Sequence, residues 1–152
     1  MTGETNLPKL IKEMSPLLNN GEYVFVTVRD LSKISREITV CEFKEKEGTT
    51  IVIAREKADE LNLTYGYIAA WITLKIHSSL EVVGLTALFS TELAKHAISC
   101  NVIAGYYHDH IFVDIKDTAK AVNVLTLFSR SYGVKSFNDI QIRKTYNQFT
   151  EN

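Results

Sequence analysis

The sequence lacks most of the features that mark specialised classes of protein. It has only two cysteines, Cys41 and Cys100, and two prolines among 152 residues. Two cysteines are too few for a disulfide framework, and each is most simply a small hydrophobic residue in a reducing compartment. No apolar run approaches the roughly 20 residues that span a bilayer. The N-terminus also lacks the basic and apolar regions of a secretory signal. These absences predict a cytoplasmic protein that does not enter a membrane.

An excess of charge of either sign is also missing. The 17 basic and 18 acidic residues leave a formal net charge of −1. Nucleic-acid-binding domains usually carry a basic footprint, so we expect no nucleic-acid partner. The densest charged run, residues 42–47, alternates in sign and is typical of a solvated hairpin. A chain of this length and of ordinary globular composition forms one domain or two small lobes.

The motifs of common catalytic sites are absent too. No serine lies in a G-x-S-x-G setting, and neither cysteine has an evident histidine partner. The most metal-like stretch is His108-Asp109-His110, but aspartate is also a favoured turn residue. No cysteine or glutamate lies near this stretch, so a turn between strands is the preferred interpretation. We therefore predict no catalytic residue, no cofactor and no metal site.

The first half of the sequence predicts strands and short helices in alternation. Pro8 suits a first helical position, and Pro16 should end or kink the helix that follows. Runs of β-branched and aromatic residues mark buried strands, and Gly48 suits a hairpin turn. The predicted elements are a helix over residues 7–18, a strand over 23–28, a short helix over 29–37, a hairpin of 41–44 with 49–53, and a helix over 54–61.

The second half gives clearer periodicity. Residues 71–77 alternate between apolar and polar side chains, which indicates a strand with one buried face. An apolar row at spacings of four then predicts a helix of about three turns. The remaining elements are strands over 102–107 and 111–115, a helix capped by Asp117 and ended by Gly133, and an edge strand containing Ile140 and Ile142. The apolar row of the first helix is Leu85, Phe89, Leu93 and Ala97, and that of the second is Ala121, Leu125 and Phe128.

This order of elements specifies a fold class. A β-α-β-β-α-β sequence closes into a four-stranded antiparallel sheet with both helices on one face. The first half follows the same order in degraded form. The prediction is therefore an α+β protein of two ferredoxin-like lobes, which cover residues 1–68 and 69–152. Since edge strands of such sheets need pairing or cover, we also expect a homodimer.

Three stretches of the chain resemble a known family. They are MSPLLNNGEYVFVTV, FKEKEGTTIVI and AAWITLKIHSSLEVVGLTALFSTELAKHAISCNVIAGYYHDHIFV. Together they are similar to the ACT domain, and specifically to bacterial proteins that consist of two ACT lobes in tandem. The regulatory domains of aspartate kinases and the cytosolic arginine sensors are related to these proteins. The resemblance implies a non-catalytic regulatory protein that binds a free amino acid where two lobes meet.

The resemblance also implies where the ligand binds. In such relatives the loop after the first strand and the start of the second strand supply the contacts. Here these segments are residues 77–85 and 101–105. Many relatives carry Asp-x-x-Gly in the first segment, whereas this chain has Ser-Ser-Leu-Glu-Val-Val-Gly. The candidate ligand-binding residues are Ser78, Ser79, Leu80, Glu81, Val83, Gly84, Asn101, Ala104 and Gly105.

The loop chemistry suits a zwitterion such as an amino acid. Unpaired N–H groups at the start of a helix attract a carboxylate, and Gly84 lets backbone approach the ligand. Glu81 suits an α-ammonium group, and Asn101 offers both a donor and an acceptor. The alternative is that Ser79 or a neighbouring residue simply caps the helix and that Gly84 permits packing.

Two other functions remain open on the sequence alone. The lobes could have lost their ligand site and serve as a dimeric module that binds a protein partner. The other alternative is a small metal-dependent enzyme that uses residues 108–110.

Overall fold

The computed structural model describes residues 3–132 and arranges their strands in one antiparallel sheet of seven strands. The strand order is β3-β4-β2-β5-β7-β6, and β1 pairs with β5 as well. The strands are β1 (Ser15–Leu18), β2 (Tyr23–Val28), β3 (Thr39–Lys44), β4 (Thr49–Ala54), β5 (Ile68–Lys75), β6 (Cys100–Ala104) and β7 (Asp109–Asp114).

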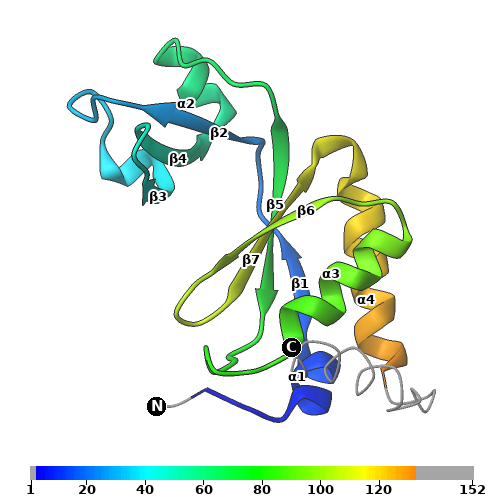
Figure 1. Ribbon diagram of the computed structural model, residues 1–152. Helices are drawn as coiled ribbons and strands as arrows, with labels where there is room; N and C mark the ends of the chain where they lie inside the picture. Colours follow the sequence, from blue (N-terminus) through cyan, green and yellow to red (C-terminus); the bar gives the residue numbers. More distant parts are fainter. Residues whose placement is uncertain (1–2, 133–152) are drawn as a thin grey trace, which may run out of the picture.

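Strand β5 joins two groups of strands. Its first two residues, Ile68 and Ala69, pair with β2, and the rest of the strand lies between β1 and β7. We call β2, β3 and β4 with the start of β5 the N-terminal lobe, and β5, β7, β6 and β1 the C-terminal lobe. Figure 1 shows β5 running from one lobe to the other. The proposed division of the sequence between residues 68 and 69 falls inside this strand.

The helices cover one face of the C-terminal sheet (Figure 1). They are α1 (Leu7–Glu13), α3 (Leu85–Lys95) and α4 (Thr118–Ser131), while α2 (Arg55–Glu60) belongs to the N-terminal lobe. Two short 3₁₀ helices, η1 (Arg36–Ile38) and η2 (Ile115–Asp117), complete the described elements. The α+β class with ferredoxin-like lobes is confirmed.

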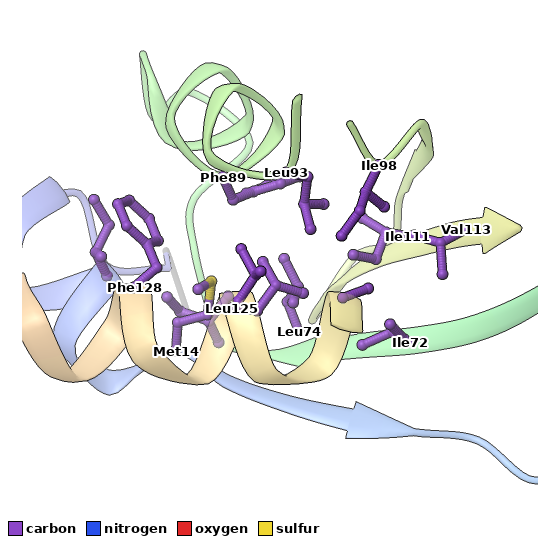
Figure 2. Close-up of a cluster of buried hydrophobic side chains, with 14 of the residues drawn as sticks. Met14, Ile72, Leu74, Phe89, Leu93, Ile98, Ile111, Val113, Leu125 and Phe128 are labelled. Carbon is purple, nitrogen blue, oxygen red and sulfur yellow. The ribbon is translucent and has the colours of Figure 1, made fainter. Parts of the chain in front are cut away.

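The main core lies between the C-terminal sheet and these helices. Ile72 and Leu74 of β5 are fully buried against Phe89 of α3 and Leu125 of α4. Figure 2 shows Met14, which follows α1, beside Leu125 in the same cluster. The N-terminal segment therefore contributes to the core of the lobe that lies furthest from it in sequence.

The predicted helix over residues 7–18 is wrong in its second half. Asn6 caps α1 by accepting a hydrogen bond of 3.0 Å from the Lys9 N–H, and the helix ends at Glu13. Ser15–Leu18 instead form β1, which runs antiparallel to the end of β5. Pro16 lacks an N–H group, which an edge strand tolerates, and among residues 3–132 β1 pairs with β5 alone. Strand β1 occupies the position beside β5 that a βαββαβ order gives to its last strand.

The short helix predicted over residues 29–37 is reduced to the 3₁₀ helix η1. The Asp30 carboxylate accepts hydrogen bonds from the N–H and hydroxyl groups of Ser32, at 2.8 and 2.9 Å. These bonds hold the Asp30 pKa below its usual range. Side-chain bonds of this kind compete with helical ones, and they favour a turn in this segment.

Two details of the C-terminal lobe also differ from prediction. Helix α3 ends at Lys95, and Ala97 is an exposed residue with a φ of +57° rather than part of the buried row. The turn between β6 and β7 lies at residues 105–108, so Asp109 and His110 are the first residues of β7 and not turn residues.

The other predicted elements are present. Strand β2, the β3–β4 hairpin and helices α2, α3 and α4 lie where the sequence places them, and Ala121, Leu125 and Phe128 are buried. Asp117 occupies the N-cap position of α4, although its side chain makes no capping hydrogen bond. Gly133, Ile140 and Ile142 lie outside the described residues. No helix within residues 3–132 is long and apolar enough to cross a membrane.

Both cysteines are free and half-buried, on opposite edges of the sheet. Burial raises the pKa of the Cys41 thiol and of the Cys100 thiol. A raised pKa keeps a thiol protonated and unreactive, so these residues serve as packing groups.

Candidate functional site

We call residues 3–6, which precede α1, the N-terminal arm. A pocket of about 350 Å³ lies where the loop after β5 meets this arm and the β6–β7 turn. This volume is at the lower end of the range for small-molecule sites, about 300–1,000 Å³. Its lining residues are Gly3, His77, Ser78, Ser79, Leu80, Glu81 and Tyr106.

The N-terminal arm forms one wall of this pocket by pairing with the loop. The Glu4 N–H donates to the His77 carbonyl at 2.9 Å, and the Ser79 N–H donates to the Glu4 carbonyl at 3.0 Å. Gly3 lies so close to the loop that a Cβ there would be 2.5 Å from the Ser78 carbonyl carbon and from the Ser79 nitrogen. Only glycine fits at this position.

The arm is held to α1 by the Glu4 side chain. Its carboxylate accepts hydrogen bonds of 2.9 Å from the N–H groups of Thr5 and Asn6. It also forms a 2.6 Å ion pair with Lys9 Nζ, and these contacts lower the Glu4 pKa to about 2. The arm, the first turn of α1 and the pocket loop are therefore connected.

The pocket loop leads into α3, whose first residues lie outside the pocket lining. Gly84 precedes the helix with a φ of +98°, and no side chain caps the helix. The Ser79 hydroxyl accepts from the Glu81 N–H at 3.3 Å, and the Ser79 carbonyl accepts from the Val82 N–H at 3.1 Å. Ser79 therefore closes a turn inside the loop and does not cap α3.

Four of the nine predicted ligand-binding residues line the pocket: Ser78, Ser79, Leu80 and Glu81. Val83 and Gly84 belong to the same loop, but neither lines the pocket, and the Val83 side chain is 68% exposed.

The structure does not bring the second predicted segment to the pocket as a whole. Asn101 lies near the start of β6, where its Nδ2 approaches the Phe112 carbonyl at 3.5 Å. With a rise of about 3.4 Å per residue, Asn101 is about 10 Å along the strand from Ala104. Ala104 ends β6, and Gly105 donates to the His108 carbonyl at 2.9 Å in the turn. Only this end of the segment adjoins the pocket.

Sequence reasoning missed two lining residues, Gly3 and Tyr106, while His77 lies in the predicted segment 77–85 but not among the candidate residues. The His77 ring lies 5.5 Å from the ring of Tyr107, which in turn contacts Tyr106 at 5.0 Å between centroids. Two adjacent tyrosines before a turn are the sequence signal that could have indicated an exposed aromatic surface here.

The stretch His108-Asp109-His110 does not form one cluster. His108 lies in the turn, with Nδ1 3.4 Å from the Ile76 carbonyl, whereas Asp109 and His110 are consecutive residues of β7. Successive strand residues point to opposite faces of a sheet. Among residues 3–132, no group of three or more histidine, cysteine, aspartate or glutamate side chains is placed to hold a metal ion.

Comparison with known families identifies the two lobes. One ACT-domain family model matches residues 2–70, and a second matches residues 67–126. The chain belongs to the ACT-domain family. The two matches follow each other along the chain, so the ACT domains are in tandem.

Solved structures resemble this ACT protein over most of its length. A Vibrio cholerae protein of unknown function, described as a possible transport protein, is 44% identical with a TM-score of 0.73; the match covers 82% of this chain and 97% of the other. An Agrobacterium tumefaciens protein has a TM-score of 0.58 at 14% identity, covering 76% and 89%. Clostridium acetobutylicum aspartate kinase has a TM-score of 0.53 at 14% identity, covering 78% and 34%. The last two show the fold alone. No curated protein matched the chain.

The C-terminal ACT lobe also holds a polar network on the sheet face that the helices leave open. His110 Nδ1 accepts a 3.0 Å hydrogen bond from Trp71 Nε1 and lies 3.1 Å from the Thr73 hydroxyl. That hydroxyl accepts a 2.9 Å bond from Asn19 Nδ2. Because the indole group can only donate, His110 is held as the neutral imidazole with its proton on Nε2.

Stability is expected to fall as the pH drops below about 6.5, in part because of His110. Burial lowers the His110 pKa from its ordinary value of 6.5; nearby His108 lowers it further and Asp109 opposes the shift. The unfolded chain therefore takes up this proton at a higher pH than the folded chain does. Stability from this residue is full above the unfolded pKa and declines as the pH falls toward the folded pKa.

Urea unfolding of the wild type and of His110→Gln at pH 7.5, 6.5 and 5.5 measures this contribution. The difference between the two proteins isolates His110 from other groups, including Asp109, whose pKa burial raises. We expect the variant to lose less stability on acidification. Equal losses in both proteins would contradict the assignment.

Proposed function

We propose that this ACT protein is a non-catalytic regulatory module, cytoplasmic and homodimeric, that binds a free amino acid or similar small zwitterion in the pocket lined by the loop after β5. The observation that carries the proposal is the pocket itself, whose loop supplies two serine hydroxyl groups and a carboxylate. Family membership supports a regulatory role rather than a catalytic one.

The pocket chemistry matches the two charges of an amino acid. The ring of His77 lines the pocket and offers an N–H donor to a carboxylate. The hydroxyl groups of Ser78 and Ser79 add hydrogen-bonding capacity. Glu81 is exposed at the rim and supplies the negative charge that an α-ammonium group needs.

A second copy of the chain accounts for Asn101 in this proposal. Within residues 3–132, β6 is an edge strand, so its outer backbone groups are open to another strand. Antiparallel pairing of two β6 strands about Val102 places Asn101 of one copy opposite Ile103 of the other. Asn101 would then approach the strand end that carries Gly105 and Tyr106, beside the pocket of the other copy.

A thermal-unfolding screen against the free amino acids tests the function. A ligand at about 100 times its dissociation constant stabilises the folded state by about 2.7 kcal/mol. For a chain of this size, that raises the unfolding midpoint by about 5–10 °C. We expect at least one amino acid to produce such a shift, and we expect Ser79→Ala and Glu81→Gln each to reduce it. If none shifts the midpoint at millimolar concentration, the sensor proposal fails.

A matched control separates ligand contacts from general effects of charge. Glu37 is an exposed glutamate of the N-terminal lobe, so Glu37→Gln removes the same charge far from the pocket in the fold. This variant should respond to the amino acid as the wild type does. The oligomeric state of each variant, measured by sedimentation, should remain unchanged.

The alternative function is a ligand-free dimeric module that binds a protein partner. Four large apolar or aromatic side chains near the pocket are more than 60% exposed, and such patches mark interaction surfaces: Leu80 71%, Val83 68%, Tyr106 67% and Tyr107 62%. The double substitution Val83→Ser with Tyr107→Ser discriminates the two functions, because neither residue lines the pocket. It should weaken assembly or partner binding if this surface is an interface.

A further inference from the structure

A second pocket, of about 420 Å³, lies in the N-terminal lobe. It is lined by Val28, Arg29 and residues 44–49, so it lies between the end of β2 and the β3–β4 turn. The first pocket lies between the end of β5 and the β6–β7 turn. The strand orders β3-β4-β2 and β6-β7-β5 correspond, and the two pockets therefore occupy equivalent places in the two lobes.

The hairpin turn is fixed close to the end of β2. The Glu45 N–H donates to the Gly48 carbonyl at 2.9 Å and closes the turn. A Cβ on Gly48 would lie 2.8 Å from the Thr27 hydroxyl oxygen and 3.0 Å from the Val28 carbonyl oxygen. Glycine is therefore required for this close approach, which defines the floor of the second pocket.

The two pockets differ in how they can attract a negative charge. The loop of the first pocket leads into the eleven-residue helix α3, whereas the segment after β2 contains only the short helix η1. In place of a helix terminus, the second pocket has three cationic side chains: Arg29, Lys44 and Lys46. Among residues 3–132 the ion pairs within 4.0 Å involve none of these three.

The carboxylates that line the second pocket do not fully cancel this positive charge. The lining contains three cations and two carboxylates, Glu45 and Glu47, which leaves one net positive charge. The Glu45 carboxylate accepts a hydrogen bond from the Thr50 hydroxyl, and Asp30 does not line the pocket. The guanidinium fork of Arg29 remains available for two parallel hydrogen bonds to an oxyanion.

We propose that the N-terminal lobe has its own ligand site, which takes a small anion of at least two negative charges through Arg29, Lys44 and Lys46. The chemistry shared by suitable ligands is a pair of carboxylates or a phosphate group. This site lies in the other lobe from the amino-acid pocket and needs no ligand there. One chain would thus sense two classes of metabolite, each through one lobe.

Amide chemical shifts of the full chain test this site directly. The protein is titrated with inorganic phosphate and, in a separate arm, with succinate, while sodium chloride keeps the ionic strength constant. We expect saturable shifts of the Arg29, Gly48 and Thr49 amides and none at Ser79 or Tyr106. The arm that saturates at the lower concentration identifies a phosphate group or a dicarboxylate as the preferred ligand.

Two charge variants decide whether the cations form a site. Arg29→Gln with Lys46→Gln should raise the dissociation constant at least tenfold, whereas Lys12→Gln with Lys75→Gln removes two charges elsewhere and should leave it unchanged. All four positions are at the surface, and equal unfolding midpoints will show that the fold is intact. The proposal is overturned if the amide shifts do not saturate in either titration, or if both double variants change the dissociation constant equally. Either result leaves the amino-acid pocket untouched, since Ser79 and Tyr106 report on it separately.

Discussion

Replacing Phe112 with alanine is expected to destabilise the protein by about 3–5 kcal/mol, the usual cost of removing a buried phenylalanine. Phe112 lies on β7 and is fully buried. Its ring packs edge-on against Phe25 of β2, at 5.2 Å between centroids, and stacks on Trp71 of β5 at 6.1 Å. Phe112 therefore connects the two lobes on the face of the sheet that the helices leave open.

The same contact is expected to make the two lobes unfold together. Strands β2 and β5 pair through only two residue pairs, Tyr23 with Ala69 and Val24 with Ile68. The ring cluster around Phe112 supplies further contacts between the lobes, because Tyr23 and Phe25 come from one lobe and Phe112 comes from the other. The unfolding midpoint should fall by on the order of 10 °C in a single transition.

Phe43→Ala is the matched control for this prediction. Phe43 is also a strand phenylalanine, but it lies on edge strand β3 and is 70% exposed. Its replacement should change stability by less than about 0.5 kcal/mol. Two separate transitions, only one of which moves in Phe112→Ala, would show that the lobes are energetically independent.

Local periodicity explains which parts of the fold were predictable. Strand β2 and helix α3 were placed almost to the residue, because each has an apolar pattern of one clear period. The pocket loop followed from these elements, since it connects β5 to α3. Gly84 was likewise recognisable, and its φ of +98° explains why glycine stands there.

Non-local pairing explains what the sequence could not show. The four residues of β1 contain a proline and continue an amphipathic helix pattern, and their partner strand lies about 60 residues away, as in the pair Ser15–Lys75. The same holds for the pocket wall, because Gly3 reaches Ser78 only through this fold. Asn101 was grouped with the loop by family position, yet within one chain β6 carries it away from the pocket.

A chain shortened to begin at Asn19 is expected to lose the folded C-terminal lobe. The deleted segment contributes Leu10, Ile11 and Met14 to the main core, where they are at most 3% exposed. Each such side chain is worth about 2–5 kcal/mol, against a total stability of about 5–15 kcal/mol for a typical domain. The deletion also exposes the edge of β5 that β1 covers. Amide spectra should lose the dispersed resonances of β5, β6 and β7.

A chain that begins at Thr5 tests whether this effect comes from the core or from the arm. It keeps Asn6, α1 and β1 but loses the backbone pairing of Glu4 with the loop. This protein should remain folded, because Gly3 and Glu4 contribute no side chain to the core. Its affinity for an amino acid should fall, since the pocket has lost the wall that Gly3 forms. If the chain beginning at Asn19 stays folded, β1 and α1 are dispensable and the C-terminal lobe is complete without them. If the chain beginning at Thr5 unfolds as well, the arm stabilises the lobe and does more than enclose the pocket.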